Sequence, residues 1–154
     1  GYGSLADAYH PSAPDPSGKW EARAIEMALA DAGIAAERVD ALVAHATGTP
    51  KGDTAEIQAI NRVHGDRRRG KLPVASVKGH LGHSGASSGG MALITGLLGM
   101  REERFVFTAN TDEPDPEAKF DIVISEPRHM KVEILQINAF GFGGQNASIV
   151  VTRT

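Results

Sequence analysis

The strongest constraint on the fold is the order in which strand-like and helix-like segments alternate along the chain. Short apolar runs at residues 41–44 and 71–77 precede segments at 53–63 and 84–100 whose apolar residues recur with helical spacing. Residues 19–31 form a further predicted helix, which ends at a glycine. Because strands that alternate with helices favour a layered arrangement, the sequence predicts an α/β domain with helices packed on a mixed sheet.

Strand-like segments also open and close the chain. Residues 2–10 are predicted as an edge strand or an extended lead-in, and residues 105–109 as a short strand. Residues 132–139 and 147–152 are the clearest strand candidates, and the glycines at 141–144 between them indicate a hairpin turn. The predicted order is therefore βαβαβαβ followed by a ββ pair.

Composition limits the classes of function. The 154 residues suit one domain, and their formal charge of −3 is spread along the chain without the basic footprint of a nucleic-acid-binding protein. For the basic cluster at 67–71, a solvated loop is favoured over a docking patch. No apolar run approaches the roughly 18 residues of a membrane span, and no signal-peptide pattern is visible. We expect a cytoplasmic protein with no membrane partner, and the opening without Met indicates a piece of a longer chain.

Polar residues follow the first predicted buried strand. His45 comes directly after it, and Thr47 and Thr49 add hydroxyls to the same loop. Functional groups gather beyond the carboxyl ends of strands in α/β sheets, although a lone histidine there is more often structural. Asp53 and Glu56 have the spacing of a helix-capping box, which is favoured over a catalytic carboxylate pair.

A second polar group follows the next predicted strand. Lys78 and His83 precede a helix whose N-terminus favours the neutral form of a nearby histidine, as the lysine does too. A neutral imidazole can donate a hydrogen bond to a developing negative charge. Because glycine weakens a helix, Gly85, Gly89 and Gly90 indicate that another backbone approaches this helix closely.

A metal site is disfavoured. His80 and His83 have ligand-like spacing, but the chain has no cysteine and no third ligand in a fixed motif. His80 is interpreted as a loop or surface residue. The remaining histidines, His10, His64 and His129, have no motif around them and are expected to be structural or exposed.

The turn at 141–144 alternates aromatic and glycine residues. It lacks the lysine and the following helix of a phosphate-binding loop. It is either a plain tight turn or a backbone that approaches a ligand, with Phe142 lining a pocket.

Taken together, the segments HATGTP at 45–50, KGHLGH at 78–83 and NAFGFGGQN at 138–146 resemble the C-terminal half of the elongating β-ketoacyl-acyl-carrier-protein synthases. The resemblance covers essentially the whole chain, so residues 1–154 would be one domain. It implies one βαβαβαββ half of the thiolase-like fold, and places a nucleophilic cysteine in an N-terminal half that this chain does not contain. This chain departs from the family pattern at Ala46, Gly79 and Ala139, where glycine, serine and serine are usual.

The resemblance also implies roles for individual residues. His45 and His83 match histidines that bind the malonyl thioester carbonyl, and Lys78 matches a lysine that orients them. The backbone N–H of Phe142 matches half of an oxyanion hole, and its ring matches an acyl gate. The residues implied to contact pantetheine or malonyl, or to support the site, are Thr47, Thr49, Ser12, Phe140, Glu56 and Asp53.

The implied reaction is a decarboxylating Claisen condensation in fatty acid or polyketide synthesis. It needs no cofactor held by the protein, because phosphopantetheine arrives on an acyl carrier protein. The implied partners are that carrier, the N-terminal half and a second copy of the full enzyme. Without cysteine, this chain alone is expected to be inactive and to pair with another chain or expose apolar surface. The alternative is a non-catalytic domain that binds a carrier or a partner half.

Overall fold

The computed structural model describes residues 1–153, which form a six-stranded sheet with the order β1-β8-β7-β2-β3-β5. Strands β7, β2, β3 and β5 run parallel to one another, whereas β8 pairs antiparallel with both β7 and β1. The strands are β1 (Tyr2–Ala6), β2 (Ala41–Val43), β3 (Pro73–Ala75), β5 (Asp121–Ile122), β7 (Ile134–Gly141) and β8 (Gln145–Thr152). The predicted mixed sheet and closing hairpin are confirmed.

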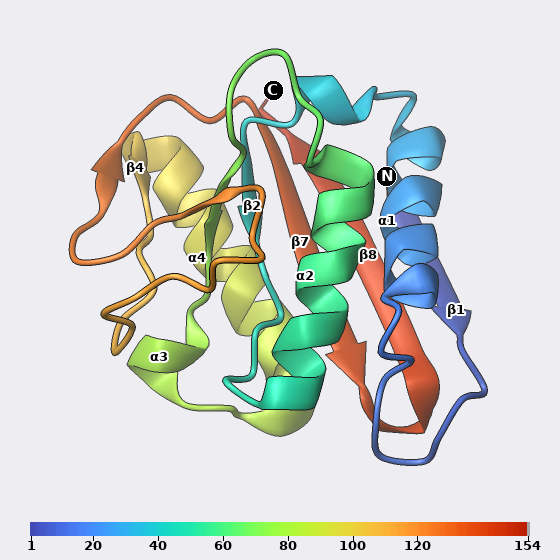
Figure 1. Ribbon diagram of the computed structural model, residues 1–154. Helices are drawn as coiled ribbons and strands as arrows, with labels where there is room; N and C mark the ends of the chain where they lie inside the picture. The colour runs from blue at the N-terminus through green and yellow to red at the C-terminus, as the bar shows by residue number, and fades with distance from the viewer. Residues whose placement is uncertain (154) are drawn as a thin grey trace.

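Helices cover both faces of this sheet (Figure 1). Helices α1 (Lys19–Ala32) and α2 (Pro50–His64) pack on one face, and α4 (Ser88–Glu102) packs on the other. The short helix α3 (Lys78–Leu81) lies between β3 and α4 in the chain. Each face has its own apolar core, so the predicted α/β layering is confirmed.

The remaining elements are short. Strands β4 (Arg104–Phe105) and β6 (Arg128–His129) form a separate antiparallel pair. One-turn 3₁₀ helices lie at η1 (Ala36–Arg38), η2 (Gly85–Ser87) and η3 (Phe142–Gly144). The last of these is the glycine turn between β7 and β8.

Several predicted element bounds were wrong. The first strand ends at Ala6 instead of continuing to residue 10, and the strand predicted at 105–109 is only the two-residue β4. The helix predicted at 84–100 is divided into η2 and α4. Gly85, the first residue of η2, has a φ of +64° in the left-handed region, so an α-helix that began at residue 84 could not pass through it.

Glycines let α4 approach the sheet, although not at all the predicted positions. A Cβ on Gly89 would lie 3.3 Å from the Cβ of Ala139, which confirms close packing there. A Cβ on Gly85 or on Gly90 would meet no atom within 4 Å, so the prediction of a close approach was wrong for these two glycines. The tightest approach is at Gly96, where a Cβ would collide with the side chain of Leu135 on β7.

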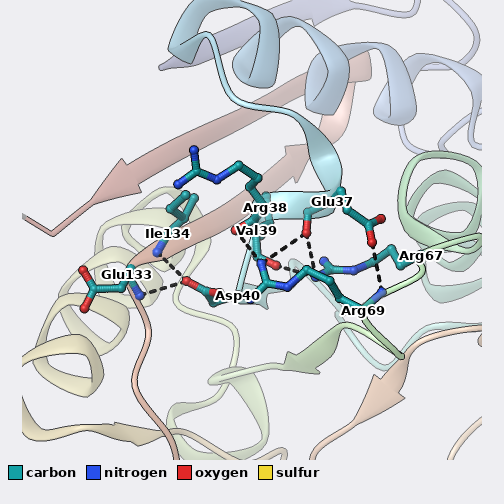
Figure 2. A network of polar contacts seen from close by, with 8 residues as sticks. All are labelled: Glu37, Arg38, Val39, Asp40, Arg67, Arg69, Glu133 and Ile134. Atoms are coloured by element: carbon teal, nitrogen blue, oxygen red, sulfur yellow. Dashed lines mark hydrogen bonds and ion pairs between the residues drawn. The ribbon is translucent and has the colours of Figure 1, made fainter.

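Polar contacts fasten the amino ends of β2 and β7 (Figure 2). The Asp40 carboxylate accepts hydrogen bonds from the backbone N–H of Glu133, at 3.0 Å, and Ile134, at 2.9 Å. Arg69 lies 3.2 Å from the same carboxylate, and Arg67 donates to the carbonyl of Val39 at 2.7 Å. The solvated-loop interpretation was wrong for Arg67, whose half-buried guanidinium donates to backbone carbonyls, and it is confirmed for Arg69, whose side chain is 54% exposed.

One face of α4 carries exposed apolar side chains. Met91, Ile94, Leu97 and Leu98 are 38–60% exposed, with Ile94 the most exposed of them. Ala92, Gly96 and Met100 on the opposite side of the helix are buried against the sheet. The expectation of exposed apolar surface is therefore confirmed. Among the described residues, no helix is long and apolar enough to span a membrane.

Candidate functional site

The candidate site lies beyond the carboxyl ends of β2 and β3. These strands are parallel neighbours, so the loops that follow them reach the same edge of the sheet. His45 follows β2 and Lys78 begins α3 after β3. The Lys78 ammonium lies 3.3 Å from Nδ1 of His45 and also donates to the carbonyl oxygen of that residue. The topology therefore joins the two polar groups that the sequence keeps 33 residues apart.

The buried carboxylate of Glu56 fixes the backbone of the loop that carries His45. Its carboxylate, on the sheet-facing side of α2, accepts hydrogen bonds from the backbone N–H of His45 at 2.9 Å and Ala46 at 2.6 Å. The side-chain amide of Asn138 on β7 donates a further bond at 3.2 Å. Burial raises the pKa of Glu56, while these N–H donors favour the ionised form. Glu56 therefore fixes the backbone of the site instead of facing outward as an acid or base.

The backbone conformation at Ala46 explains why glycine is the usual residue at this position of the family pattern. Its φ is +27°, which lies outside the regions that side-chain-bearing residues prefer. The two hydrogen-bonded N–H groups and the Ser76 hydroxyl, 3.3 Å from the Ala46 carbonyl, hold the backbone there. Glycine is favoured at such a position, and this chain keeps the conformation without it.

His45 is held in its neutral form. Burial lowers its pKa to about 3, and the charge of Lys78 and the nearby His83 ring act in the same direction. Burial likewise lowers the pKa of Lys78, opposed by Glu56 and Asp53. Because an ammonium only donates hydrogen bonds, Nδ1 of His45 is the acceptor and Nε2 carries the proton.

His83 presents the same kind of donor from a second loop. Its Nδ1 accepts from the backbone N–H of Gly85 at 3.2 Å and lies 3.0 Å from the Ser88 hydroxyl. In a neutral His83 ring, the proton therefore lies on Nε2. The rings of His45 and His83 meet edge to face with centroids 5.7 Å apart. The two imidazoles thus form one cluster of N–H donors.

The structure brings only some of the other predicted residues to this cluster. Phe140 on β7 is buried, and its ring centroid lies 5.8 Å from that of His45. Phe142 is 82% exposed on η3, and its neighbour Gly143 donates to the carbonyl of Pro11 at 2.8 Å. Ser12 is exposed in that same adjoining loop. The loop that holds Ser12 therefore contacts the exposed turn that carries Phe142.

The threonines and Asp53 shape the start of α2. The hydroxyl of Thr49 accepts from the backbone N–H of Gly52 and lies 2.9 Å from that of Thr47. The helix begins at Pro50 and not at Asp53, so the prediction that Asp53 caps it was wrong. Asp53 instead accepts from the backbone N–H of Gly48 at 3.1 Å, and burial raises its pKa.

His80 is anchored away from the other histidines. Its Nε2 lies 2.7 Å from the carbonyl oxygen of Phe107, and its ring packs edge-on against the Phe107 ring. Over residues 1–153, no His, Cys, Asp and Glu side chains gather as a metal-binding group of three or more. His80 thus attaches α3 to the segment that contains Phe107.

Sequence reasoning missed several polar residues beneath the site. The Ser88 hydroxyl lies 3.0 Å from Nδ1 of His83. Ser148 on β8 is buried next to Asn138, Gln136 is buried two residues earlier on β7, and His64 is buried at the end of α2. The signal was present in β7, where Gln136 and Asn138 alternate with apolar residues in a strand that is buried on both faces.

Known proteins share this architecture. The family model described as beta-ketoacyl synthase, C-terminal domain, matches residues 1–112. A 3-oxoacyl-[acyl-carrier-protein] synthase 2 of Coxiella burnetii is 39% identical over 153 residues, covering 99% of this chain and 37% of the relative. A synthase of the same name from Staphylococcus aureus is 39% identical over 150 residues, 97% of this chain and again 37% of the relative.

Solved structures agree with these matches. The ishigamide ketosynthase/chain length factor superposes on the whole chain with a TM-score of 0.93 and 35% identity, over 37% of its own length. A type II polyketide ketosynthase in complex with its acyl-carrier protein superposes on the whole chain with a TM-score of 0.94 and 28% identity, over 38% of its own length. The thiolase-like half-fold is thus confirmed, over little more than a third of each relative. The chain belongs to the family of β-ketoacyl synthase C-terminal domains.

Proposed function

We propose that this chain is the C-terminal half of a β-ketoacyl-acyl-carrier-protein synthase. The observation that carries the proposal is the pair of imidazoles, His45 and His83, with their centroids 5.7 Å apart and Nδ1 of each already engaged. Their Nε2–H groups are then free to donate to one substrate oxygen. Such donors stabilise the negative charge that develops on a thioester carbonyl.

The proposed reaction is a decarboxylating Claisen condensation. The malonyl carboxylate leaves as CO₂, and its bonding electrons form an enolate whose oxygen is held by His45 and His83. The enolate carbon attacks an acyl thioester on a cysteine supplied by the remainder of the protein, because this chain has none. A carbon–carbon bond forms, the carbon–sulfur bond breaks and the thiolate is regenerated, so no metal or redox cofactor enters the scheme.

The other predicted residues take supporting roles in this proposal. Thr47 and Thr49 would bond the phosphopantetheine arm of the carrier, with Ser12 on the adjoining loop. Phe140 would line the malonyl site, and exposed Phe142 would close the acyl pocket and offer its backbone N–H to the acyl oxygen. Lys78 would keep His45 neutral and correctly protonated.

The remainder of the protein would cover the apolar face of α4. Ile94 and its exposed neighbours on that helix are the side chains that a tightly packed partner would bury. By this proposal the acyl carrier protein, the N-terminal half and a second copy of the enzyme are its partners. Fatty acid and polyketide synthesis would both fit the site.

CO₂ release from malonyl-carrier protein by the full-length protein tests the proposal. His45→Ala and His83→Ala should each lower the rate by about 10²-fold or more, because each removes one donor to the enolate oxygen. His129→Ala, at an exposed position on β6, is the matched control and should retain the wild-type rate. Wild-type rates in both site variants would refute the proposal, and carrier binding without CO₂ release would favour a non-catalytic domain.

A further inference from the structure

A row of buried polar side chains runs from the candidate site along the sheet surface under α2. Gln136 and Asn138 lie two residues apart on β7 and so share one face. Ser148 on β8 is the register partner of Asn138. These three side chains are at most 1% exposed, as is His64 at the carboxyl end of α2. Polar groups so deeply buried require partners.

Hydrogen bonds join these side chains in sequence. Nε2 of His64 lies 2.9 Å from Oε1 of Gln136, whose Nε2 donates to the Ser148 hydroxyl at 3.0 Å. Ser148 lies 2.9 Å from Oδ1 of Asn138, closer than the 3.4 Å to the carbonyl of Ile137. Asn138 then donates to Glu56 at 3.2 Å. The row ends on the carboxylate that holds the His45 backbone.

The carboxylate sets the direction of every bond in the row. Because both Glu56 oxygens already accept backbone N–H groups, we assign Glu56 as the acceptor from Asn138, which turns its Nδ2 toward Glu56 and its Oδ1 toward Ser148. The Ser148 hydroxyl must then donate to Oδ1, which leaves its oxygen to accept from Gln136. His64 completes the order by donating from Nε2 to Oε1 of Gln136. Burial lowers the pKa of His64 to about 4, so the ring is neutral and has one proton to give.

We infer that Gln136, Ser148 and His64 are positioning residues, which lock the Asn138 amide and thereby the Glu56 carboxylate beneath His45. The inference rests on the proposed function of the site. Without the donor from Gln136, the Ser148 hydroxyl loses a bond that holds it in place, and its own bond to Oδ1 of Asn138 no longer fixes the amide against Glu56. Stability gives little reason for such a row, since apolar residues of similar shape can replace a buried polar pair at little cost.

The decisive variant is Gln136→Leu in the full-length protein, because it removes the amide and keeps most of the volume. We expect kcat for CO₂ release from malonyl-carrier protein to fall about five- to tenfold with KM unchanged, since a shifted His45 affects the reacting geometry more than the carrier arm. Ile137→Val, at a buried position facing α4, is the matched control and should leave kcat within about twofold.

A double-mutant cycle separates positioning from general destabilisation. If Gln136 acts through Glu56, Gln136→Leu should lower kcat no further in a Glu56→Gln background. The inference would be overturned if the losses of kcat in the two single variants multiplied in the double variant. It would also be overturned if Gln136→Leu left kcat unchanged in an enzyme whose wild type is active. Should Gln136→Leu not fold, Ser148→Ala and Ser148→Thr replace it. The alanine should reproduce the loss and the threonine, which keeps the hydroxyl, should restore the rate.

Hydrogen exchange gives a readout that needs no substrate, so it distinguishes failure of this inference from failure of the proposed function. The backbone N–H groups of His45 and Ala46 are bonded to Glu56. Gln136→Leu should accelerate their exchange about tenfold relative to Ile137→Val. Equal exchange rates in Gln136→Leu and Ile137→Val would overturn the inference, whether or not the protein releases CO₂. Faster exchange in Gln136→Leu, in a protein whose wild type releases no CO₂, would refute the proposed function and leave the inference standing.

Discussion

Burial shifts the pKa of single residues in this protein far enough to fix their protonation states across the neutral pH range. His45 is the example in the candidate site, where burial lowers the pKa to about 3 and Lys78 adds its charge. The consequence is an imidazole that stays neutral at every pH near 7 and keeps its proton on Nε2. Its ability to donate a hydrogen bond is therefore built into the fold and does not depend on solution pH.

Glu21 on α1 is the second example and lies outside the candidate site. It is 3% exposed, and its Oε2 has no hydrogen-bond partner within residues 1–153. Burial, with repulsion from Glu56 and Asp7, raises its pKa to about 9 from 4.5. The folded protein thus keeps Glu21 protonated at neutral pH, where the unfolded chain ionises it.

This difference predicts a pH-dependent stability. Because the folded pKa is raised, the contribution of Glu21 becomes more unfavourable as pH rises from about 4.5 to about 9. Glu21→Gln should remove that dependence, match the wild type near pH 4 and exceed its free energy of unfolding by about 5 kcal/mol at pH 8, since each pH unit above 4.5 adds about 1.4 kcal/mol. Urea unfolding across this pH range measures it. Glu26→Gln, exposed on the same helix, is the control, and parallel curves for Glu21→Gln and wild type would contradict the expectation.

At the scale of elements, the loop before α2 serves both the helix and the candidate site. Thr49 caps the first turn, and Pro50 supplies a backbone angle already suited to a helix start. Asp53 and Glu56, one and two turns inside, then reach back to backbone N–H groups of the preceding loop. The capping-box interpretation was therefore wrong for both carboxylates, because the helix starts three residues upstream at Pro50 and Thr49 is its cap.

The Thr49 cap can be tested by its effect on stability. Thr49→Ala should lower the free energy of unfolding by about 1 kcal/mol, because the backbone N–H of Gly52 loses its acceptor. Thr49→Ser keeps the hydroxyl and is the matched control. Urea unfolding of both variants gives the comparison, and equal losses in the two would show that the methyl group and not the cap matters.

At the scale of the whole molecule, the chain has one face that its own elements do not cover. The sheet lies between α1 and α2 on one side and α4 on the other (Figure 1). The apolar side chains of Met91, Ile94, Leu97 and Leu98 on α4 are exposed. Apolar side chains grouped on one helix face usually mark a contact surface. The chain spans 37% of the length of the Coxiella burnetii synthase, so most of the protein proposed here lies outside it.

This face predicts how the 154-residue chain behaves when it is produced alone. We expect it to self-associate or bind a hydrophobic dye, and Ile94→Lys with Leu98→Lys to lower dye fluorescence by roughly half or more. Ala30→Lys, at an exposed position on α1, adds the same charge elsewhere and should change little. Dye titration with analytical ultracentrifugation provides the measurement. A dye-free monomer in the unmodified chain would contradict the expectation.

The amino-acid sequence by itself determined the element order, the α/β class and the polar segments at 45–56, 78–83 and 138–146, because periodicity and glycine placement are local properties. It could not give the bounds of β4 or the division before α4, which depend on backbone angles and on pairing with distant segments. Only the tertiary structure decided that Glu56 faces inward, that Gly96 instead of Gly90 meets the sheet, and that His64, Gln136 and Ser148 connect to Asn138. These facts depend on which side chains of α2, β7 and β8 come into contact, and the spacing of residues along the sequence does not specify those contacts.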